Sequence, residues 1–179
     1  GLIESFTAIA DASTKPCILY NVPSRTGCNL LPQSVAVLAK HPNIVAIKEA
    51  SGNFSQIAEL ISLTKGEIDV YSGNDDQIVP LLSLGGKGVI SVLSNVLPKK
   101  TVEMCDKFFA GDVKGSAEIQ LELIPLINAL FCEVNPIPVK EGMNLLGFNA
   151  GYTRLPLYEM APENVERLRK SMENYGLIK

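Results

Sequence analysis

Lys48 is the residue whose setting most clearly suggests covalent chemistry. It directly follows the apolar run Ile44–Ile47, so a strand through this run would hold the Lys48 amine in poorly solvated surroundings. Such surroundings disfavour the ammonium ion, and a neutral amine is a nucleophile that can attack a carbonyl carbon and form a Schiff base. The alternative is a strand-end lysine that extends its charge to solvent or pairs with Glu49. The residues alone leave both interpretations open.

Tyr20 and Arg25 could act on the same substrate. Tyr20 lies near the end of the preceding apolar run. Its hydroxyl could move a proton over the lysine, or its ring could belong to the core with the hydroxyl at the rim. Arg25 lies in the expected loop Pro23–Gly27. Its guanidinium could bind a substrate carboxylate through two parallel hydrogen bonds, or it could be a solvated loop residue.

Two glycine-containing segments have different predicted roles. Ser72–Asp75 joins an expected strand to an expected helix, an arrangement that suits either an anionic ligand at the helix start or ordinary helix capping. Gly85–Gly88 instead follows a helix and precedes a strand, on the opposite side of the sheet. We interpret that run as a helix end and a tight turn rather than as a phosphate-binding loop.

The elements that must position these residues alternate along the first two thirds of the chain. The expected strands are Cys17–Val22, Ile44–Lys48, Ile68–Ser72 and Val89–Leu93. The expected helices are Leu2–Ala12, Pro32–Lys40, Phe54–Leu63 with Asn53 or Ser55 as cap, a helix from Asn74 or Asp75 to Leu84, one that begins at Pro98, Val113–Phe131 with a kink at Pro125, Val139–Leu146 and Pro162–Tyr175. This alternation predicts an α/β fold with a parallel sheet covered on both faces, followed by a helical tail.

Polar residues fall where the expected strands end. They are Tyr20-Asn21, Lys48-Glu49, Ser72-Gly73 and Ser91 to Asn95. Because the carboxyl ends of parallel strands lie at one edge of the sheet and build the site in such folds, we expect these side chains to converge on a common cleft.

Composition excludes several classes of function. The 179 residues are 46% hydrophobic and 20% charged, with a formal net charge of -3. That composition indicates a globular protein, and it provides no basic field that would attract nucleic acid or an anionic membrane. No apolar run reaches the roughly 20 residues that span a bilayer. A small molecule or another protein is therefore the expected partner.

Cysteine and histidine usage argues against metal and triad chemistry. The four cysteines are scattered without a CxxC pair, and His41 is the single histidine. We expect no metal site and no Ser-His-Asp triad, and we interpret the cysteines as buried free thiols of a cytoplasmic protein. His41 precedes a proline and is expected at the end of a helix.

Several segments together resemble the dihydrodipicolinate synthase family. They are Tyr20-Asn21-Val22-Pro23-Ser24-Arg25-Thr26-Gly27, Ile47-Lys48-Glu49-Ala50-Ser51-Gly52, Tyr71-Ser72-Gly73-Asn74-Asp75, Gly88-Val89-Ile90-Ser91-Val92 and Asn135-Pro136-Ile137-Pro138-Val139-Lys140. Each segment is a weak signal alone, but their order and spacing are specific, and the resemblance covers essentially the whole chain.

The resemblance implies a class I lyase on a (β/α)8 TIM barrel. Lys48 matches the lysine that forms a Schiff base with pyruvate, and Tyr20 matches the tyrosine that relays protons. Arg25 matches the arginine that holds the carboxylate of aspartate 4-semialdehyde, and Gly73 and Ile90 match positions that line the pyruvate pocket. The implied product is 4-hydroxy-tetrahydrodipicolinate, in lysine and diaminopimelate biosynthesis, and the chemistry needs no organic cofactor or metal.

The resemblance also implies that only part of a barrel is present. We expect residues 1–110 to be the carboxyl-terminal half of the barrel, strands five to eight, and residues 111–179 to be the C-terminal helical domain. The family's Gly-Thr-Thr-Gly-Glu motif, whose threonines bind pyruvate, is absent from this sequence. A half-sheet leaves strand edges unpaired, so we expect the missing half to be needed.

The family's usual assembly is a homotetramer built as a dimer of dimers, and we expect it here. The alternatives are a relative of N-acetylneuraminate lyase, another pyruvate-dependent aldolase, or an inactive truncated fragment. The arginine loop favours the synthase, because Arg25 suits a short carboxylated aldehyde better than a sugar.

Overall fold

The computed structural model describes all residues from Gly1 to Lys179. They form two compact units, Gly1–Ile90 and Ser91–Lys179. The first unit contains α1 (Leu2–Ala12), β1 (Cys17–Asn21), α2 (Pro23–Thr26), α3 (Pro32–Leu38), β2 (Ile44–Glu49), α4 (Phe54–Thr64), β3 (Asp69–Ser72), the 3-10 helix η1 (Asp75–Gln77), α5 (Ile78–Ser83) and β4 (Gly88–Val89). The second contains the 3-10 helix η2 (Leu93–Asn95), α6 (Pro98–Phe109), α7 (Val113–Leu130), α8 (Ile137–Leu145) and α9 (Pro162–Asn174).

The first unit is built on a four-stranded parallel sheet with the order β1-β2-β3-β4. The predicted α/β class with a parallel sheet is therefore confirmed. Parallel neighbours need crossover connections, and right-handed crossovers between strands that add successively in one direction place their helices on the same face. A barrel uses this arrangement, whereas a doubly wound sheet reverses its strand order.

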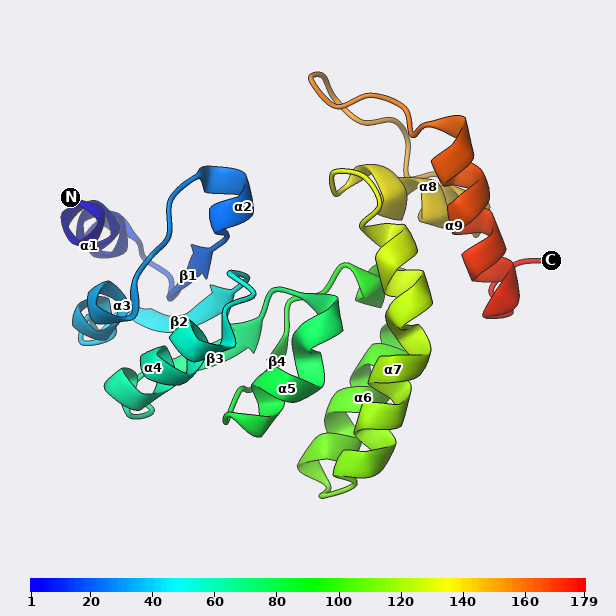
Figure 1. The fold of residues 1–179 in the computed structure, drawn as a ribbon. Helices are drawn as coiled ribbons and strands as arrows, with labels where there is room; N and C mark the ends of the chain where they lie inside the picture. Colours follow the sequence, from blue (N-terminus) through cyan, green and yellow to red (C-terminus); the bar gives the residue numbers. More distant parts are fainter. The chain divides into compact units, whose positions relative to one another are not determined.

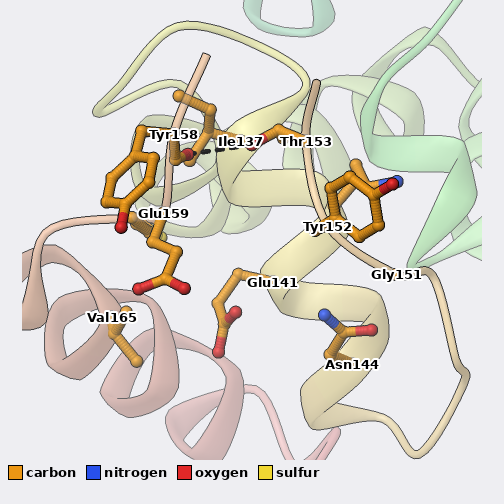
Figure 2. A pocket seen from close by; sticks show the side chains of 11 residues that line it. Ile137, Glu141, Asn144, Gly151, Tyr152, Thr153, Tyr158, Glu159 and Val165 are labelled. Atoms are coloured by element: carbon orange, nitrogen blue, oxygen red, sulfur yellow. Dashed lines mark hydrogen bonds between the residues drawn. The ribbon is translucent and has the colours of Figure 1, made fainter. Parts of the chain in front are cut away.

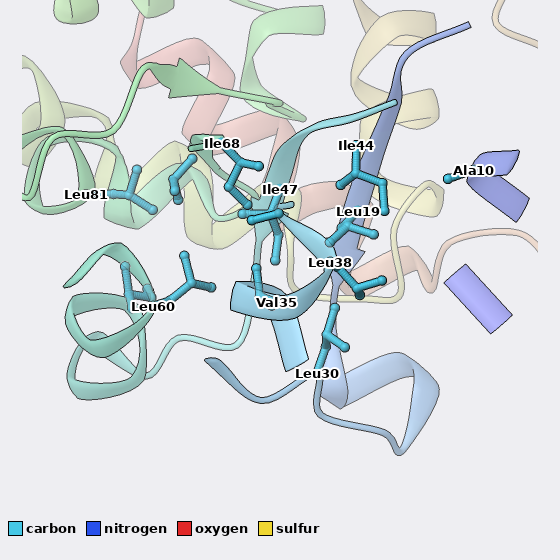
Figure 3. Packing of buried hydrophobic residues seen from close by; sticks show 13 residues of the cluster. Ala10, Leu19, Leu30, Val35, Leu38, Ile44, Ile47, Leu60, Ile68 and Leu81 are labelled. Atoms are coloured by element: carbon cyan, nitrogen blue, oxygen red, sulfur yellow. The ribbon is translucent and has the colours of Figure 1, made fainter. Parts of the chain in front are cut away.

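Helices cover one face of this sheet, and we call that face the helix-covered face. Its core joins Leu19, Ile47 and Val70 of the strands to residues of α1, α3, α4 and α5 (Figures 1 and 3). The helix residues of the cluster include Ala10, Val35, Leu38, Ile57, Leu60 and Leu81. The prediction of a sheet covered on both faces is wrong, because the sequential strand order directs these helices to a single side.

The opposite face of the sheet, which we call the open face, carries Ile18 and Tyr20. Their exposed fractions are 52% and 44%. The helix-covered residues Leu19 and Ile47 are instead buried. Alternating side chains of a strand point to opposite faces, so a single strand supplies both the core and the open face.

The fourth strand is shorter than predicted. It covers Gly88–Val89 rather than Val89–Leu93. The Ile90 amide still donates to Ser72 O at 2.9 Å, but the Ser91 side chain then accepts from the Ser94 amide at 2.8 Å. This local bond offers the backbone a turn in place of the ladder, and η2 follows directly.

Two other local predictions need correction. Pro23–Thr26 forms the one-turn helix α2 rather than a loop, with Pro23 at its start and Gly27 at φ +66° as its end. The expected helix from Asn74 or Asp75 to Leu84 is divided into η1 and α5.

Two predictions of local chemistry are confirmed. Asn53 caps α4, where its side chain accepts from the Gln56 amide at 3.1 Å. Gly85 and Gly86 end α5, with amides that donate back to Leu82 O at 2.9 Å and Leu81 O at 3.1 Å. Such backward bonds satisfy the last carbonyls of a helix, and the positive φ of Gly85, +96°, is one that glycine adopts without strain.

The second unit is helical, as predicted for the tail. In it α7 packs against α6, α8 and α9. Its fully buried side chains include Leu123, Leu126, Leu130, Leu168 and Met172. The helix α7 includes Pro125, and its predicted kink stays a prediction. The contacts place residues 91–110 with this unit, and the division at residue 110, which concerns the domains of the family, stays a prediction.

Three further observations complete the fold. All four cysteines are free, as predicted, but none is buried, since Cys28 is exposed and the other three are partly exposed. His41 follows α3 and its Nε2 lies 3.0 Å from Asp11 Oδ1 of α1. No helix is both long enough and apolar enough to cross a membrane.

Candidate active site

The open face carries a row of side chains contributed by neighbouring strands. Tyr20 of β1 pairs with Lys48 of β2, Lys48 pairs with Tyr71 of β3, and Tyr71 pairs with Gly88 of β4. Residues paired in register in neighbouring parallel strands point to the same face. The phenol of Tyr20 and the amine of Lys48 are therefore neighbours across the ladder near the carboxyl ends of the strands.

Lys48 and Tyr20 are in direct contact. The Lys48 Nζ atom lies over the Tyr20 ring, 4.3 Å from the ring centroid, and the Lys48 side chain is half-buried. Tyr20 is 44% exposed, so part of its ring is accessible on the open face. The contact holds the amine beside a phenol, which is a group that can carry a proton.

The alternative pairing of Lys48 with Glu49 is wrong. Consecutive strand residues face opposite sides of the sheet. Glu49 is 1% exposed, and its carboxylate accepts from Asn21 Nδ2 at 3.1 Å and from the Ser51 amide at 2.6 Å. The carboxylate is therefore bound on the helix-covered face, while the amine lies on the open face.

Gly73, which directly follows β3, adjoins Lys48. Its amide donates to Glu49 O at 2.8 Å. A β-carbon added at Gly73 would lie 3.0 Å from Lys48 Cε and 2.7 Å from Ala50 Cβ. A β-carbon at Gly73 would therefore crowd the two strand ends, which is a physical reason for glycine here.

Arg25 and Ile90 lie in the same unit at the ends of β1 and β4. Arg25 is an exposed residue of α2, the helix that directly follows β1. Ile90 directly follows β4, is 40% exposed, and donates its amide to β3. The structure thus brings Tyr20, Lys48 and Gly73 together, whereas Arg25 and Ile90 lie farther along the same edge of the sheet.

The expected convergence holds for only part of the strand-end residues. Asn21, Glu49 and Ser72 form the next row of the ladder and are each 1% exposed, so they lie on the helix-covered face rather than in a cleft with Lys48. The Ser72 hydroxyl donates to Asn74 O at 2.8 Å. This bond forms a turn at Ser72–Asn74. The helix capping that the sequence left open is not seen, because Asn74 makes no side-chain cap bond at the start of η1.

A cavity of about 370 Å³ lies in the second unit, between α8, α9 and the segment before α9. The carboxylates of Glu141 and Glu159 point into it, beside Tyr158 (Figure 2). The neighbouring amine of Lys140 donates to Ala150 O at 2.5 Å. Because this amine is held by a carbonyl, Lys140 is a structural lysine, in contrast to Lys48 over its aromatic ring.

Fold and site together define an α/β protein with a half-buried lysine beside a tyrosine at the carboxyl end of a parallel strand. Comparison with known proteins narrows this class. A family model described as the dihydrodipicolinate synthetase family matches residues 1–175, and the chain belongs to that family.

Similar proteins agree in sequence and in structure. The 4-hydroxy-tetrahydrodipicolinate synthase of Caldicellulosiruptor bescii is 58% identical over 177 residues, which are 99% of this chain and 60% of that protein. The crystal structure of dihydrodipicolinate synthase from Thermotoga maritima matches with a TM-score of 0.96 at 44% identity, over 99% of this chain and 62% of that one. The chloride-inhibited enzyme of Acinetobacter baumannii, complexed with pyruvate, matches with a TM-score of 0.94 at 41% identity, over 99% and 61%. The chain therefore spans about 60% of the length of these relatives.

Proposed function

We propose that the full-length protein is a lyase that condenses pyruvate with aspartate 4-semialdehyde through a Schiff base on Lys48. The observation that carries this proposal is the position of the Lys48 amine, 4.3 Å from the centre of the Tyr20 ring at the ends of adjacent strands. Membership of the family supports it, as does the likeness to the Acinetobacter baumannii enzyme, whose crystal structure is a complex with pyruvate.

The proposed reaction begins at the carbonyl of pyruvate. The neutral Lys48 amine attacks the carbonyl carbon and a C–N bond forms. The carbonyl oxygen then leaves as water with one proton supplied through the Tyr20 hydroxyl, which gives a protonated imine. The imine accepts the electron pair released when the neighbouring methyl group loses a proton, which gives an enamine. The enamine carbon then attacks the aldehyde, and the amino group of the semialdehyde displaces Lys48 from the imine carbon as the ring closes. The ring product is 4-hydroxy-tetrahydrodipicolinate, and the lysine is regenerated.

In this proposal the neighbours of Lys48 have distinct roles. The Tyr20 hydroxyl carries protons to and from the intermediates. Gly73 leaves room for pyruvate beside Lys48, and Ile90 forms an apolar wall of the same pocket. Arg25 binds the carboxylate of the semialdehyde, for which a planar guanidinium is well suited.

The site requires more of the barrel than this chain contains. We propose that the four strands are the last four of a (β/α)8 barrel, because their sequential order leaves β1 and β4 at the two sheet edges, where further strands can pair. We further propose a cytoplasmic homotetramer, a dimer of dimers, on the basis of the family resemblance.

Reductive trapping tests the Schiff base. In the full-length protein, borohydride with pyruvate should add a stable adduct at Lys48, located by peptide mass spectrometry. The matched control is Lys140→Arg, because Lys140 is the lysine held by a backbone carbonyl in the second unit. Trapping should persist in Lys140→Arg and disappear in Lys48→Arg. An adduct elsewhere, or none, contradicts the assignment.

Steady-state kinetics tests the aldehyde substrate. Arg25→Ala should impair the use of aspartate semialdehyde far more than the binding of pyruvate, because the guanidinium is assigned to the carboxylate of the aldehyde. Equal losses for both substrates would reject that role. Cleavage of N-acetylneuraminate in the same assay would identify the sibling activity instead.

A further inference from the structure

A buried polar network lies directly behind the Tyr20 and Lys48 pair. Asn21 and Glu49 each follow one member of that pair in sequence and pair with each other in the ladder. Both are 1% exposed, and Asn21 Nδ2 donates to both carboxylate oxygens of Glu49, at 3.1 and 3.4 Å. A side-chain bridge therefore joins β1 and β2 one residue beyond the row that holds the phenol and the amine.

The network extends from this bridge into the helices. Asn21 also donates to Asn29 Oδ1 at 3.0 Å and accepts from the Leu30 amide at 2.9 Å. The amides of Asn29 and Gln56 bond to each other in both directions, at 2.7 and 3.1 Å. Since Gln56 lies in the first turn of α4, the bridge is connected to the helix that follows β2.

Glu49 is the residue that joins the segments around Lys48. Its carboxylate accepts from the Ser51 amide at 2.6 Å, which fixes the chain as it leaves β2. Its backbone carbonyl accepts from Gly73, the residue that adjoins Lys48 Cε. A buried network whose polar groups are bonded in this way is rigid. Asn21 and Glu49 directly follow Tyr20 and Lys48 in the two strands, so a shift of these strand ends would also shift the side chains on the open face.

We infer that Glu49 and Asn21 are positioning residues that hold the Lys48 amine and the Tyr20 phenol in register for Schiff-base formation. The inference rests on the proposed function for its chemical readout. Neither side chain reaches the open face, so they act through the strand ends that they tie together. Displacement of reacting groups by about 1 Å can cost about a hundredfold in rate.

The test uses Glu49→Gln in the full-length protein. The variant keeps the size of the side chain, but its amide nitrogen is a donor that must face either Asn21 Nδ2 or the Ser51 amide, which are both donors. We expect the rate of borohydride-trapped pyruvate adduct formation at Lys48 to fall about ten- to a hundredfold.

A destabilising control separates positioning from general stability. Thr64→Val removes a buried hydrogen bond in the same unit, because the Thr64 hydroxyl donates to Leu60 O at 3.0 Å and Thr64 is 1% exposed. This variant should lower the thermal midpoint and leave the trapping rate within about twofold of wild type. If Glu49→Gln slows trapping no more than Thr64→Val does, the inference is wrong.

A reversed pair provides a rescue. In Asn21→Asp with Glu49→Gln, the Gln side chain can accept from the Ser51 amide and donate to the new carboxylate, which still accepts from the Leu30 amide. The Asn29 amide, which accepts from Asn21 in wild type, must turn over together with the Gln56 amide so that Asn29 donates to the new carboxylate. We expect the double variant to recover most of the trapping rate lost in Glu49→Gln. A double variant that folds and traps as slowly as the single variant contradicts the inference.

A second readout keeps this inference separate from the Schiff-base proposal. The rate of acetylation of Lys48 by acetic anhydride, measured by peptide mass spectrometry against the exposed Lys15, reports the setting of the amine without pyruvate. If wild type forms no adduct, the proposed function is wrong, and this labelling decides the inference alone. A severalfold change in Lys48 labelling in Glu49→Gln but not in Thr64→Val supports it, and an unchanged ratio overturns it.

Discussion

Replacement of Gly73 by alanine should damage both the stability of the sheet and the reactivity of Lys48. The added β-carbon would lie 2.7 Å from Ala50 Cβ, 3.0 Å from Lys48 Cε and 3.2 Å from Glu49 O. The first and third of these atoms are fixed to the backbone and cannot rotate away. The lysine carbon can move, but only by leaving its position beside Tyr20.

The size of the effect follows from the crowding. Insertion of one carbon into a well-packed site costs about 1 to 3 kcal/mol. The backbone of Gly73 does not have a positive φ, so alanine introduces no conformational strain and gains about 0.4 to 1 kcal/mol from a less flexible unfolded chain. The net expectation is a loss of about 0 to 2.6 kcal/mol in the free energy of unfolding, centred near 1 kcal/mol.

Urea denaturation of the full-length protein measures this loss, and borohydride trapping of pyruvate measures the reactivity of Lys48. Gly142→Ala is the matched control, because a β-carbon there would meet its nearest atoms at ordinary contact distances of 3.6 to 3.7 Å. Gly142 lies inside α8, so alanine should raise stability by about 0.5 to 1 kcal/mol.

A compensating change identifies the atom responsible. In Gly73→Ala with Ala50→Gly, the contact at 2.7 Å is removed while the contact with Lys48 remains. The double variant should recover part of the lost stability but keep the loss of trapping. The reasoning is refuted if Gly73→Ala unfolds at the same urea concentration as wild type and traps pyruvate at the same rate.

Two further predictions concern titration in the second unit. A hydrogen bond from Lys107 and another from the Gly115 amide hold the pKa of Asp112 below its ordinary value. This contribution to stability is present above the ordinary aspartate pKa and is lost as the pH falls through the lower pKa of the folded protein. The excess stability of wild type over Asp112→Asn, measured by urea denaturation, should therefore shrink on acidification. A difference that does not change with pH would contradict the prediction. Burial, and then the charge of Glu122, raises the pKa of Tyr175 to about 12 from 10.0. The stability difference between wild type and Tyr175→Phe, measured by urea denaturation, should therefore be constant below pH 10. As the pH rises toward about 12, wild type should lose stability relative to the variant. A constant difference across that range would refute this prediction.

Local sequence patterns predicted helix and strand bounds well where these bounds depend on interactions between residues close in sequence. Apolar periodicity predicted α1 at Leu2–Ala12, as the structure has it. The capping side chain of Asn53 marked the start of α4. The fourth strand was predicted too long, because the run Val89–Leu93 is apolar enough for a strand while the Ser91 hydroxyl favours a turn. Propensity and side-chain bonding compete at such positions, and a pattern of apolar residues records only the first.

The candidate site was predicted in part. The positions of Tyr20 and Lys48 at neighbouring strand ends followed from the pattern, and Gly73 followed from the family resemblance. Asn21 and Glu49 were expected beside them in one cleft. Their alternation with Tyr20 and Lys48 was a signal that they lie on the other face, because neighbouring residues of a strand cannot share a face.

The sequence by itself determined the parallel α/β class, the order of the elements and the lysine at the end of an apolar strand, since each depends on residues close together along the chain. Only the tertiary structure decided which face of the sheet is open, how β1 and β2 are aligned, and that the Glu49 carboxylate bonds to Asn21 rather than to its neighbour Lys48. The physical reason is that register and burial depend on contacts between residues such as Asn21 and Glu49, which are distant in sequence and meet only when the sheet has formed.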